Sequence, residues 1–276
     1  MNILFLGDVV GRSGRNALNN QLPSLKKDLE LDFVIVNCEN ATSGIGLSPD
    51  HAKEILGYGV DCITLGDHAF DQREMMFYIN EEPRIIRPLN YSKVAPGRGA
   101  KVFDLPSGKR IMVVQVLGRV FMKKPYSDPF SALEIILNDQ VMGKTVDAII
   151  VDIHAEATSE KMALGHWCDG RVSLSVGTHT HIPTSDMQFL GKGSVYQTDA
   201  GMCGDYNSVI GMDKCEPISR FVTGLNKSKF VPAKGEATLC GVFVNLNASG
   251  FATEAFSVKQ GGNLLQSSYK YQNRGK

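Results

Sequence analysis

The stretch Val172-Ser173-Leu174-Ser175-Val176-Gly177-Thr178-His179-Thr180-His181 marks the point at which the organisation of this chain changes. Its first half alternates apolar and small polar residues, which predicts a short strand over 172–176. Two histidines follow, one residue apart, just beyond the expected strand end. Histidine is the commonest neutral metal ligand among side chains, so this spacing raises a metal-site hypothesis. A His-x-His pair alone is more often a surface or core feature, and a metal site needs further ligands nearby.

Before residue 172, apolar segments of strand length alternate with segments of helical pattern. Ser48 followed by Pro49 is typical of a helix start, because serine caps free N–H groups and proline has no N–H to satisfy. Residues 84–110 are rich in Pro, Gly and Arg and are expected to form mainly loops. The expected strands are 3–6, 33–36, 62–65, 101–104, 111–117 and 148–153, and the expected helices are 13–29 with a break at Pro23, 49–56, 72–79, 129–137 and 159–164.

After residue 181 the helical pattern stops, and strands are expected over 194–197, 218–222, 237–246 and 252–258. A β-α alternation that gives way to antiparallel strands indicates an α/β fold with mixed sheets, or a sheet sandwich flanked by helices. The chain has no repeat, no low-complexity tract and no clear linker. We therefore expect residues 1–276 to form a single domain.

Composition narrows the class of protein further. The 29 basic and 29 acidic residues balance, so no global field steers nucleic acid or an anionic membrane. No apolar run is long enough to span a bilayer, and the first eight residues lack the basic region of a secretory signal. Six scattered cysteines without a Cys-x-x-Cys pair indicate reduced thiols, so we expect a cytoplasmic protein.

Polar side chains follow five of the expected core strands, at the point where each strand ends. In open α/β sheets ligands bind at the carboxyl ends of strands, because the loops there converge on one crevice. Five coincident strand ends therefore predict one site. The residues at these ends are Asp8, Glu39 and Asn40, Asp67 and His68, His154, and the pair His179 and His181.

The chemistry of this set favours transition metals over other ions. Mixed carboxylate, amide and imidazole ligands suit Mn, Fe or Zn, whereas pure oxygen sites favour Mg or Ca. Seven or so candidate ligands exceed what one ion usually takes, but two ions about 3.5–4 Å apart with a bridging carboxylate would use them all. Such a pair clamps a phosphate and activates a water, so the set predicts phosphoester hydrolysis.

Five motifs surround these residues: Asp8-Val9-Val10-Gly11, Asn37-Cys38-Glu39-Asn40, Gly66-Asp67-His68, the run from His154 to Lys161, and Gly177-Thr178-His179-Thr180-His181. They occur in the order in which the calcineurin-like metallophosphoesterases carry them. The chain resembles most closely the bacterial YmdB-type branch of that family, from the first strand to about residue 260. Two later segments, 198–202 and 208–212, add to this resemblance. It implies a four-layer α/β/β/α sandwich with mixed sheets.

The resemblance also implies how these residues share the work. Asp8, Glu39, Asn40 and His181 would hold one ion; Glu39 as bridge, Asp67, His154 and His179 would hold the other. A water between the metals would attack phosphorus, and His68 would be the general acid that protonates the leaving oxygen. The branch hydrolyses cyclic nucleotides, including 2′,3′-cyclic ones, with Fe or Mn, and Zn is the other candidate. No base-reading residue identifies the nucleotide, so this substrate rests on the resemblance. We also expect a homo-oligomer and no membrane partner, and nothing in the sequence supports association with RNA.

Two positions depart from the commonest pattern of the wider family. Position 10 is valine where most members carry a ligand histidine, and Asn40 takes that role in the YmdB-type branch. Asp67 stands where the usual residue is asparagine. The extra carboxylate should tighten ion binding and partly offset the Lewis acidity that a phosphate feels.

Two rival functions remain at this point. One is a phosphomonoesterase or protein phosphatase on the same scaffold. The other is a regulatory protein whose metal site senses or scaffolds a nucleotide or RNA. Loss of the general acid would favour the regulatory protein, but His68 is present.

Several further residues have two interpretations each. Gly11-Arg12-Ser13-Gly14-Arg15 is either a phosphate-binding nest or an ordinary turn into a helix. Glu156 either orients an imidazole or caps a helix. His51 and His166 are expected to be structural or surface residues. Asp205-Tyr206-Asn207 could line a pocket or a subunit contact.

Overall fold

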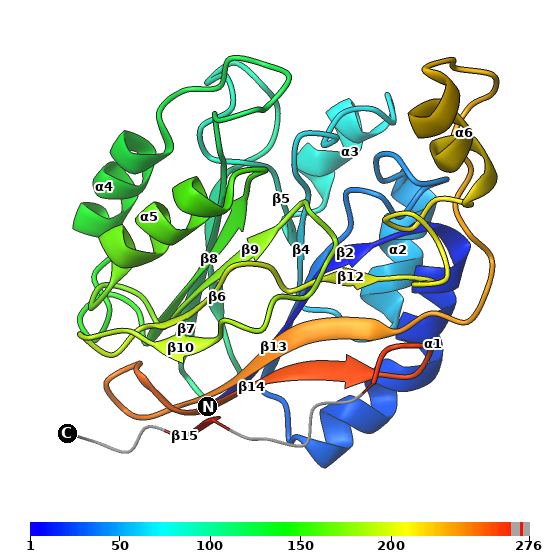
Figure 1. Cartoon of the computed structure of the whole chain (residues 1–276). Coiled ribbons are helices and arrows are strands. Elements are labelled where there is room, and N and C mark those ends of the chain that lie inside the picture. The colour runs from blue at the N-terminus through cyan, green and yellow to red at the C-terminus, as the bar shows by residue number, and fades with distance from the viewer. Residues whose placement is uncertain (266–270, 273–276) are drawn as a thin grey trace.

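Alternate residues of the first strand, β1 (Asn2–Leu6), face two different layers of the molecule. Ile3 and Phe5 belong to the core between the two large sheets, whereas Leu4 and Leu6 belong to the core beneath helices. Successive side chains of a strand point to opposite faces, so a strand that is apolar throughout must be covered on both sides. The computed structural model, which describes residues 1–265 and 271–272, accordingly shows two stacked sheets with helices on both outer faces (Figure 1). The predicted α/β/β/α sandwich is confirmed.

The first sheet has seven strands, with β1 at its centre. β1 pairs in parallel with β3 and antiparallel with β13, so the sheet is mixed as predicted. Its outer face is covered by α1 (Gly11–Asp28), α2 (Pro49–Gly57) and α3 (Met75–Glu81). The strand order is β15 (Tyr271–Gln272), β14 (Ala252–Gln260), β13 (Leu239–Leu246), β1, β3 (Phe33–Asn37), β4 (Cys62–Thr64) and β5 (Ile85–Ile86).

The second sheet has six strands and is covered by α4 (Pro129–Asp139) and α5 (Thr158–Cys168). A short ladder between β2 (Asp8–Val9) and β12 (Met202–Cys203) lies where the chain leaves β1, and α6 (Cys215–Thr223) follows it (Figure 1). The strand order is β10 (Gln188–Phe189), β11 (Val195–Gln197), β9 (Leu174–Thr178), β8 (Ala148–His154), β7 (Arg110–Leu117) and β6 (Ala100–Asp104).

The strand predicted over 218–222 is wrong, because these residues lie in α6. Ile218, Phe221 and Val222 have the i, i+3, i+4 spacing of one helix face, and all three are exposed. The short segment 218–222 resembles a strand in sequence, but its apolar residues form one side of an amphipathic helix. Gly224 ends this helix in the left-handed conformation, with a φ of 70°.

Other element boundaries also differ from the prediction. α1 continues through Pro23, although proline removes one hydrogen bond of the helix. Leu22 and Leu25, on either side of Pro23 in the sequence, pack into the core and hold the helix in place. Strand β9 runs from Leu174 to Thr178, so it begins and ends two residues later than expected. Helix α3 begins at Met75 and not at residue 72. The helix start at Ser48 is confirmed, since its side chain accepts a hydrogen bond from the His51 N–H.

None of the helices among the described residues is long and apolar enough to cross a membrane. All six cysteines lie in the described part of the chain as free thiols, and only Cys215 is exposed. The other five therefore act as small apolar side chains.

The core between the sheets makes a direct prediction about stability. Ile35 is fully buried there, so Ile35→Ala should lower the free energy of unfolding by about 2–5 kcal/mol through lost contacts and a cavity. Ile135 is 74% exposed on α4, and Ile135→Ala should change stability by less than about 0.5 kcal/mol. Urea unfolding of both variants measures the difference. Equal losses would contradict this description of the core.

Candidate metal centre

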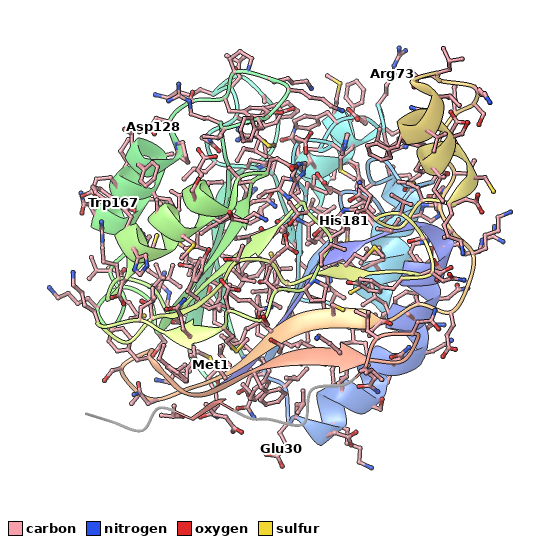
Figure 2. The ribbon with its side chains drawn as sticks, in the orientation of Figure 1. Met1, Glu30, Arg73, Asp128, Trp167 and His181 are labelled. Atoms are coloured by element: carbon pink, nitrogen blue, oxygen red, sulfur yellow. The ribbon has the colours of Figure 1, made fainter. Side chains whose placement is uncertain are left out.

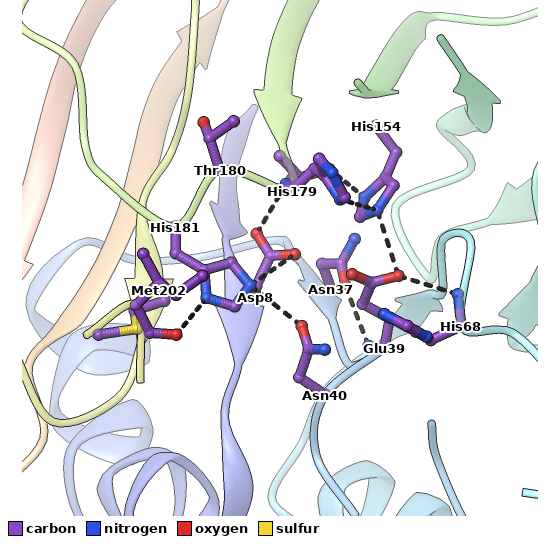
Figure 3. A network of polar contacts seen from close by, with 12 residues as sticks. Asp8, Asn37, Glu39, Asn40, His68, His154, His179, Thr180, His181 and Met202 are labelled. Carbon is purple, nitrogen blue, oxygen red and sulfur yellow. Dashed lines mark hydrogen bonds and ion pairs between the residues drawn. The ribbon is translucent and has the colours of Figure 1, made fainter. Parts of the chain in front are cut away.

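The predicted ligands come together at one edge of the molecule, where strands of both sheets end (Figure 3). The first sheet supplies the turns after β3 and β4, and the second sheet supplies the end of β8 and the turn after β9. Asp8 comes from β2, in the short ladder with β12 that follows β1. A hydrogen bond from Asn37 Nδ2 to Asp152 Oδ2, 3.3 Å long, joins the two sheets just beneath this edge. The residues that meet there are Asp8, Glu39, Asn40, Asp67, His154, His179 and His181.

One group of ligand atoms consists of Glu39, Asp67, His154 and His179. Their candidate ligand atoms all lie within 4.8 Å of one another. His154 Nε2 is 3.2 Å from Glu39 Oε2 and 3.2 Å from Asp67 Oδ1. His179 Nδ1 is 3.1 Å from the same His154 nitrogen and 3.4 Å from Asp67 Oδ1. Two carboxylates and two imidazoles therefore converge on one point.

A second group consists of Asp8, Glu39 and His181, again within 4.8 Å. His181 Nε2 is 3.8 Å from Asp8 Oδ1 and 3.1 Å from Asn40 Oδ1, so the amide of Asn40 belongs beside this group. Glu39 is a member of both groups. A carboxylate has two oxygens, so one residue in this position can serve two neighbouring cations at once.

The residues in this edge fit a cation. Asp8 is fully buried, and its Oδ1 atom has no hydrogen-bond partner among the described residues. Burial raises the pKa of Asp8 well above its usual range, so the positive charge that the protein itself places nearby does not fully compensate this carboxylate. Burial also lowers the pKa of His181, and a neutral imidazole is the form that binds a metal.

Opposite charges within the first group stabilise one another. Burial opposes the charged form of His154, but the Glu39 charge and the Asp67 hydrogen bond raise the pKa of this imidazole well above its usual value. Burial likewise opposes ionisation of Asp67, yet hydrogen bonds from His154 and His179 hold the pKa of its carboxyl below the usual range. Positive charge at this point is thus strongly stabilised, whether a proton or a metal carries it.

Gly66 allows this close approach of ligands. A Cβ atom at this position would lie 2.0 Å from Glu39 Oε2 and 2.7 Å from His154 Cε1, so any other residue would push the ligands apart. Its φ of 155° also lies outside the range that other residues adopt easily.

His68 lies beside the two groups and belongs to neither. Its Nδ1 is 2.7 Å from Asp71 Oδ2, while its Nε2 is 4.0 Å from Asp67 Oδ2. The side chain is 23% exposed, and its backbone N–H donates to Glu39 Oε2 at 3.3 Å. The imidazole is therefore oriented by one carboxylate and is partly exposed to solvent.

A sequence profile described as YmdB-like protein matches residues 4–258. The chain belongs to the YmdB-like family. A Bacillus subtilis (strain 168) protein named 2′,3′-cyclic-nucleotide 2′-phosphodiesterase is 40% identical over 247 residues, which cover 90% of this chain and 92% of the relative. The predicted resemblance to this branch is thus confirmed.

Solved structures show the same YmdB-like fold. The crystal structure of a hypothetical protein from Thermus thermophilus has a TM-score of 0.88 and 38% identity, and it covers 95% of this chain and 100% of that chain. A crystal structure described as a novel phosphatase, from Mycoplasma pneumoniae, has a TM-score of 0.87 and 36% identity, with 95% and 93% covered. Both similarities extend over the whole YmdB-like sandwich.

Residues behind the ligands of this YmdB-like chain escaped the sequence analysis. Thr178 Oγ1 lies 2.8 Å from His154 Nδ1 and donates to Asp152 Oδ1 at 2.6 Å. Asp152 also accepts hydrogen bonds from Thr64 and Gln115, at 2.6 and 2.7 Å. These contacts fix the imidazole ring and leave Nε2 directed at the ligand group. A charged residue inside the apolar run 148–153 was the available signal.

The loop that carries both histidines after β9 is strained and tightly held. His179 and His181 have φ values of 89° and 66°, which residues other than glycine rarely adopt. Between them, Thr180 donates from Oγ1 and from its backbone N–H to Asp199 Oδ2, at 2.6 and 3.2 Å. Lys161 Nζ pairs with the same carboxylate at 2.8 Å, and both charged side chains are fully buried. This ion pair stabilises the strained loop.

Of the other candidate residues, Glu156 contacts a proposed ligand, whereas His51 and His166 do not. Glu156 Oε2 lies 3.1 Å from His179 Nε2, which favours the orienting role over helix capping. His51 pairs with Thr42 Oγ1 at 2.7 Å, and His166 is exposed on α5, so neither joins the site. Figure 2 shows the neighbouring Trp167 at the outer surface and His181 within the molecule.

The segment from Gly11 to Arg15 is the first turn of α1, as the structural interpretation expected. Arg15 donates to the carbonyl oxygen of Ala41 at 2.5 Å and pairs with Glu54 at 3.2 Å. Arg12 and Arg15 line a separate groove of about 960 Å³ between α1 and residues 230–237, which none of the seven predicted ligands lines.

The Asp205-Tyr206-Asn207 segment is structural as well. Tyr206 donates its hydroxyl to the His181 carbonyl oxygen at 3.1 Å, and Asp205 accepts from the backbone of Gly235 at 2.8 Å. The segment therefore fixes the chain behind the second ligand group.

The buried ion pair predicts a large cost for removing one partner. Lys161→Met should lower the free energy of unfolding by about 3–5 kcal/mol, because Asp199 would be left as an uncompensated buried charge. The matched Lys144→Met change, at an exposed lysine, should leave stability within about 0.5 kcal/mol of the parent. Chemical denaturation provides the comparison. Similar stabilities of the two variants would show that the pair does not hold this loop.

Proposed function

We propose that this chain is a metal-dependent phosphodiesterase that hydrolyses small cyclic nucleotides at a centre of two metal ions. The observation that carries the proposal is the membership of Glu39 in both ligand groups. Two groups that share one carboxylate suit a pair of ions better than two separate sites. The Bacillus subtilis relative, named as a 2′,3′-cyclic-nucleotide phosphodiesterase, supports the reaction and the substrate class.

The ligands would divide as the geometry groups them. Asp8, Asn40 and His181 would hold one ion, while Asp67, His154 and His179 would hold the other, with Glu39 between them. A bound pair of Fe, Mn or Zn ions would supply Lewis acidity and a nucleophilic water to a phosphate diester. The buried contacts of Thr178 and Asp152 hold the His154 ring, one of these ligands, in a fixed orientation.

His68 is the proposed general acid. The Asp71 carboxylate accepts a hydrogen bond from Nδ1 of His68. This contact directs the other ring nitrogen of His68, Nε2, toward the ligand groups. A proton on Nε2 can pass to the leaving alkoxide oxygen when the phosphorus–oxygen bond breaks. The partial exposure of His68 lets a substrate reach this nitrogen from solvent.

A second function has an observation in its favour. The similar Mycoplasma pneumoniae structure is described as a phosphatase, so hydrolysis of phosphate monoesters is the alternative. Relative rates on bis(p-nitrophenyl) phosphate and p-nitrophenyl phosphate separate the two activities. The homo-oligomer and the cytoplasmic location stay predictions.

Removing the proposed acid should separate catalysis from metal binding. His68→Ala should lower kcat for a diester by about 10²–10⁴-fold while the metal content is retained, because His68 lies outside both ligand groups. His166→Ala, at an exposed histidine on α5, should leave both unchanged. Steady-state kinetics and elemental analysis measure these quantities. Full diester hydrolysis by His68→Ala would refute the acid role.

The shared carboxylate should matter more to metal content than an unshared one. Glu39→Gln should lose most of the roughly two bound ions per chain, whereas Asp8→Asn should lose about one. Glu134→Gln on α4 is the matched control and should keep both. Elemental analysis after dialysis gives the stoichiometry. A Glu39→Gln protein that keeps two ions would rule out the bridge.

A further inference from the structure

Three aromatic side chains from three separate loops form a row beside the candidate metal centre. Phe70 lies two residues after His68, Tyr91 lies between β5 and β6, and Tyr126 lies in the connection between β7 and α4. The ring centroids of Phe70 and Tyr91 are 5.7 Å apart, and those of Tyr91 and Tyr126 are 5.4 Å apart. Rings at these separations attract each other. Both tyrosine residues are half-buried, so neither is closed off from solvent.

The connection that carries Tyr126 is fixed at the metal centre. Asn90 Nδ2 donates to the carbonyl oxygens of Leu117 and Ser127, at 2.8 Å each, and so closes the two ends of this connection on one side chain. Leu117 is the neighbour of His154 in the ladder between β7 and β8. The connection therefore starts beside a ligand residue, and it ends at α4 near Asp128 (Figure 2).

The first residues of the same connection have their own contacts. The Glu160 carboxylate accepts hydrogen bonds from the backbone N–H groups of Arg119 and Val120, at 2.9 and 3.1 Å. A Cβ atom at Gly118 would lie only 2.5 Å from Ala155 Cβ, so glycine is required for this approach to the end of β8. The backbone that leads to Tyr126 is thus held by the same turn that follows His154.

The pKa of Tyr126 is consistent with a position near the ligand groups. Burial, and then the negative charges of neighbouring groups, raise the pKa of Tyr126 above its ordinary value. Asp67 and Glu39 are among those groups, and both belong to the proposed metal ligands. The tyrosine hydroxyl is therefore within electrostatic reach of the centre.

We propose that Tyr91 and Tyr126 form the surface on which the nucleobase of the substrate stacks. The inference rests on the proposed function, because it concerns the same phosphodiester. In a nucleoside 2′,3′-cyclic phosphate the base and the phosphate are attached to one ribose ring, so the base must lie close to the metal ligands. Every base has a flat π-face, and stacking on aromatic rings accepts all of them. The protein should then prefer nucleotides, whatever their base, over phosphodiesters that lack a base.

A pair of substrates tests this surface directly. Adenosine 2′,3′-cyclic phosphate and methyl riboside 2′,3′-cyclic phosphate carry the same reacting ring, and only the first has a base. The parent protein with Mn²⁺ should favour the adenosine compound in kcat/KM by about 5- to 150-fold, the range that one stacked base provides. Tyr126→Leu should reduce this preference toward unity. Tyr126→Phe should retain the parental preference for the adenosine compound, because the ring is kept and only the hydroxyl is lost.

Controls separate stacking from folding and from the proposed reaction. Phe221→Leu replaces an aromatic ring that is 88% exposed on α6 and should keep the parental preference, and thermal unfolding should show that all variants are folded. Equal parental rates on the two substrates, or a preference that survives Tyr126→Leu, would overturn the stacking surface and leave the proposed function standing. Loss of the preference in Tyr126→Phe would assign the effect to the hydroxyl and also overturn stacking. Hydrolysis of neither substrate would overturn the proposed function itself.

Discussion

Burial of charged groups between the two sheets is the constraint on which the rest of this structure depends. The side chains of Asp8, Glu39 and His154 are ionisable, yet these residues are at most 1% exposed. Charge that is removed from water is expensive unless nearby opposite charge and hydrogen bonds compensate it. The convergence of carboxylates and imidazoles on one edge meets this requirement only in part, since Asp8 Oδ1 has no partner among the described residues. A cation at this edge would complete the compensation.

The sandwich provides the rigidity that such an edge needs. Apolar residues on both faces of β1 fix it between two cores, and β2 then delivers Asp8 directly from the strand end. Asp152 of β8 ties the second sheet to the first, because it accepts hydrogen bonds from Asn37 of β3 and Thr64 of β4. Ligands on strand ends are held more precisely than ligands on long loops, because the strand ladder limits their movement. The strained loop after β9 is the exception, and the buried pair of Lys161 and Asp199 stabilises it.

Local sequence signals could predict the elements and the ligand positions, but not the contacts that join distant segments. A polar residue directly after an apolar strand is a local feature, and that signal found all seven residues that meet at the edge. Asp152 and Thr64, in contrast, are 88 residues apart, and their pairing depends on how the sheets stack. Tyr126 lies in a connection without periodicity, so no local pattern predicts its position near the ligand groups. The strand predicted over 218–222 was wrong, because its apolar residues have the spacing of a helix and lie in α6.

The carboxylate at position 67 bears on the choice between the two phosphoesterase activities. Asp8, Glu39 and Asp67 together would place three negative charges around two divalent ions, which leaves about one unit of net positive charge. Asparagine at this position would leave about two. A phosphodiester carries one negative charge and a phosphomonoester dianion carries two, so a two-ion centre with Asp67 would match the charge of the diester. A smaller net charge would also be less costly to bury between two apolar cores. At such a centre, the residue that departs from the commonest pattern would therefore favour diester hydrolysis.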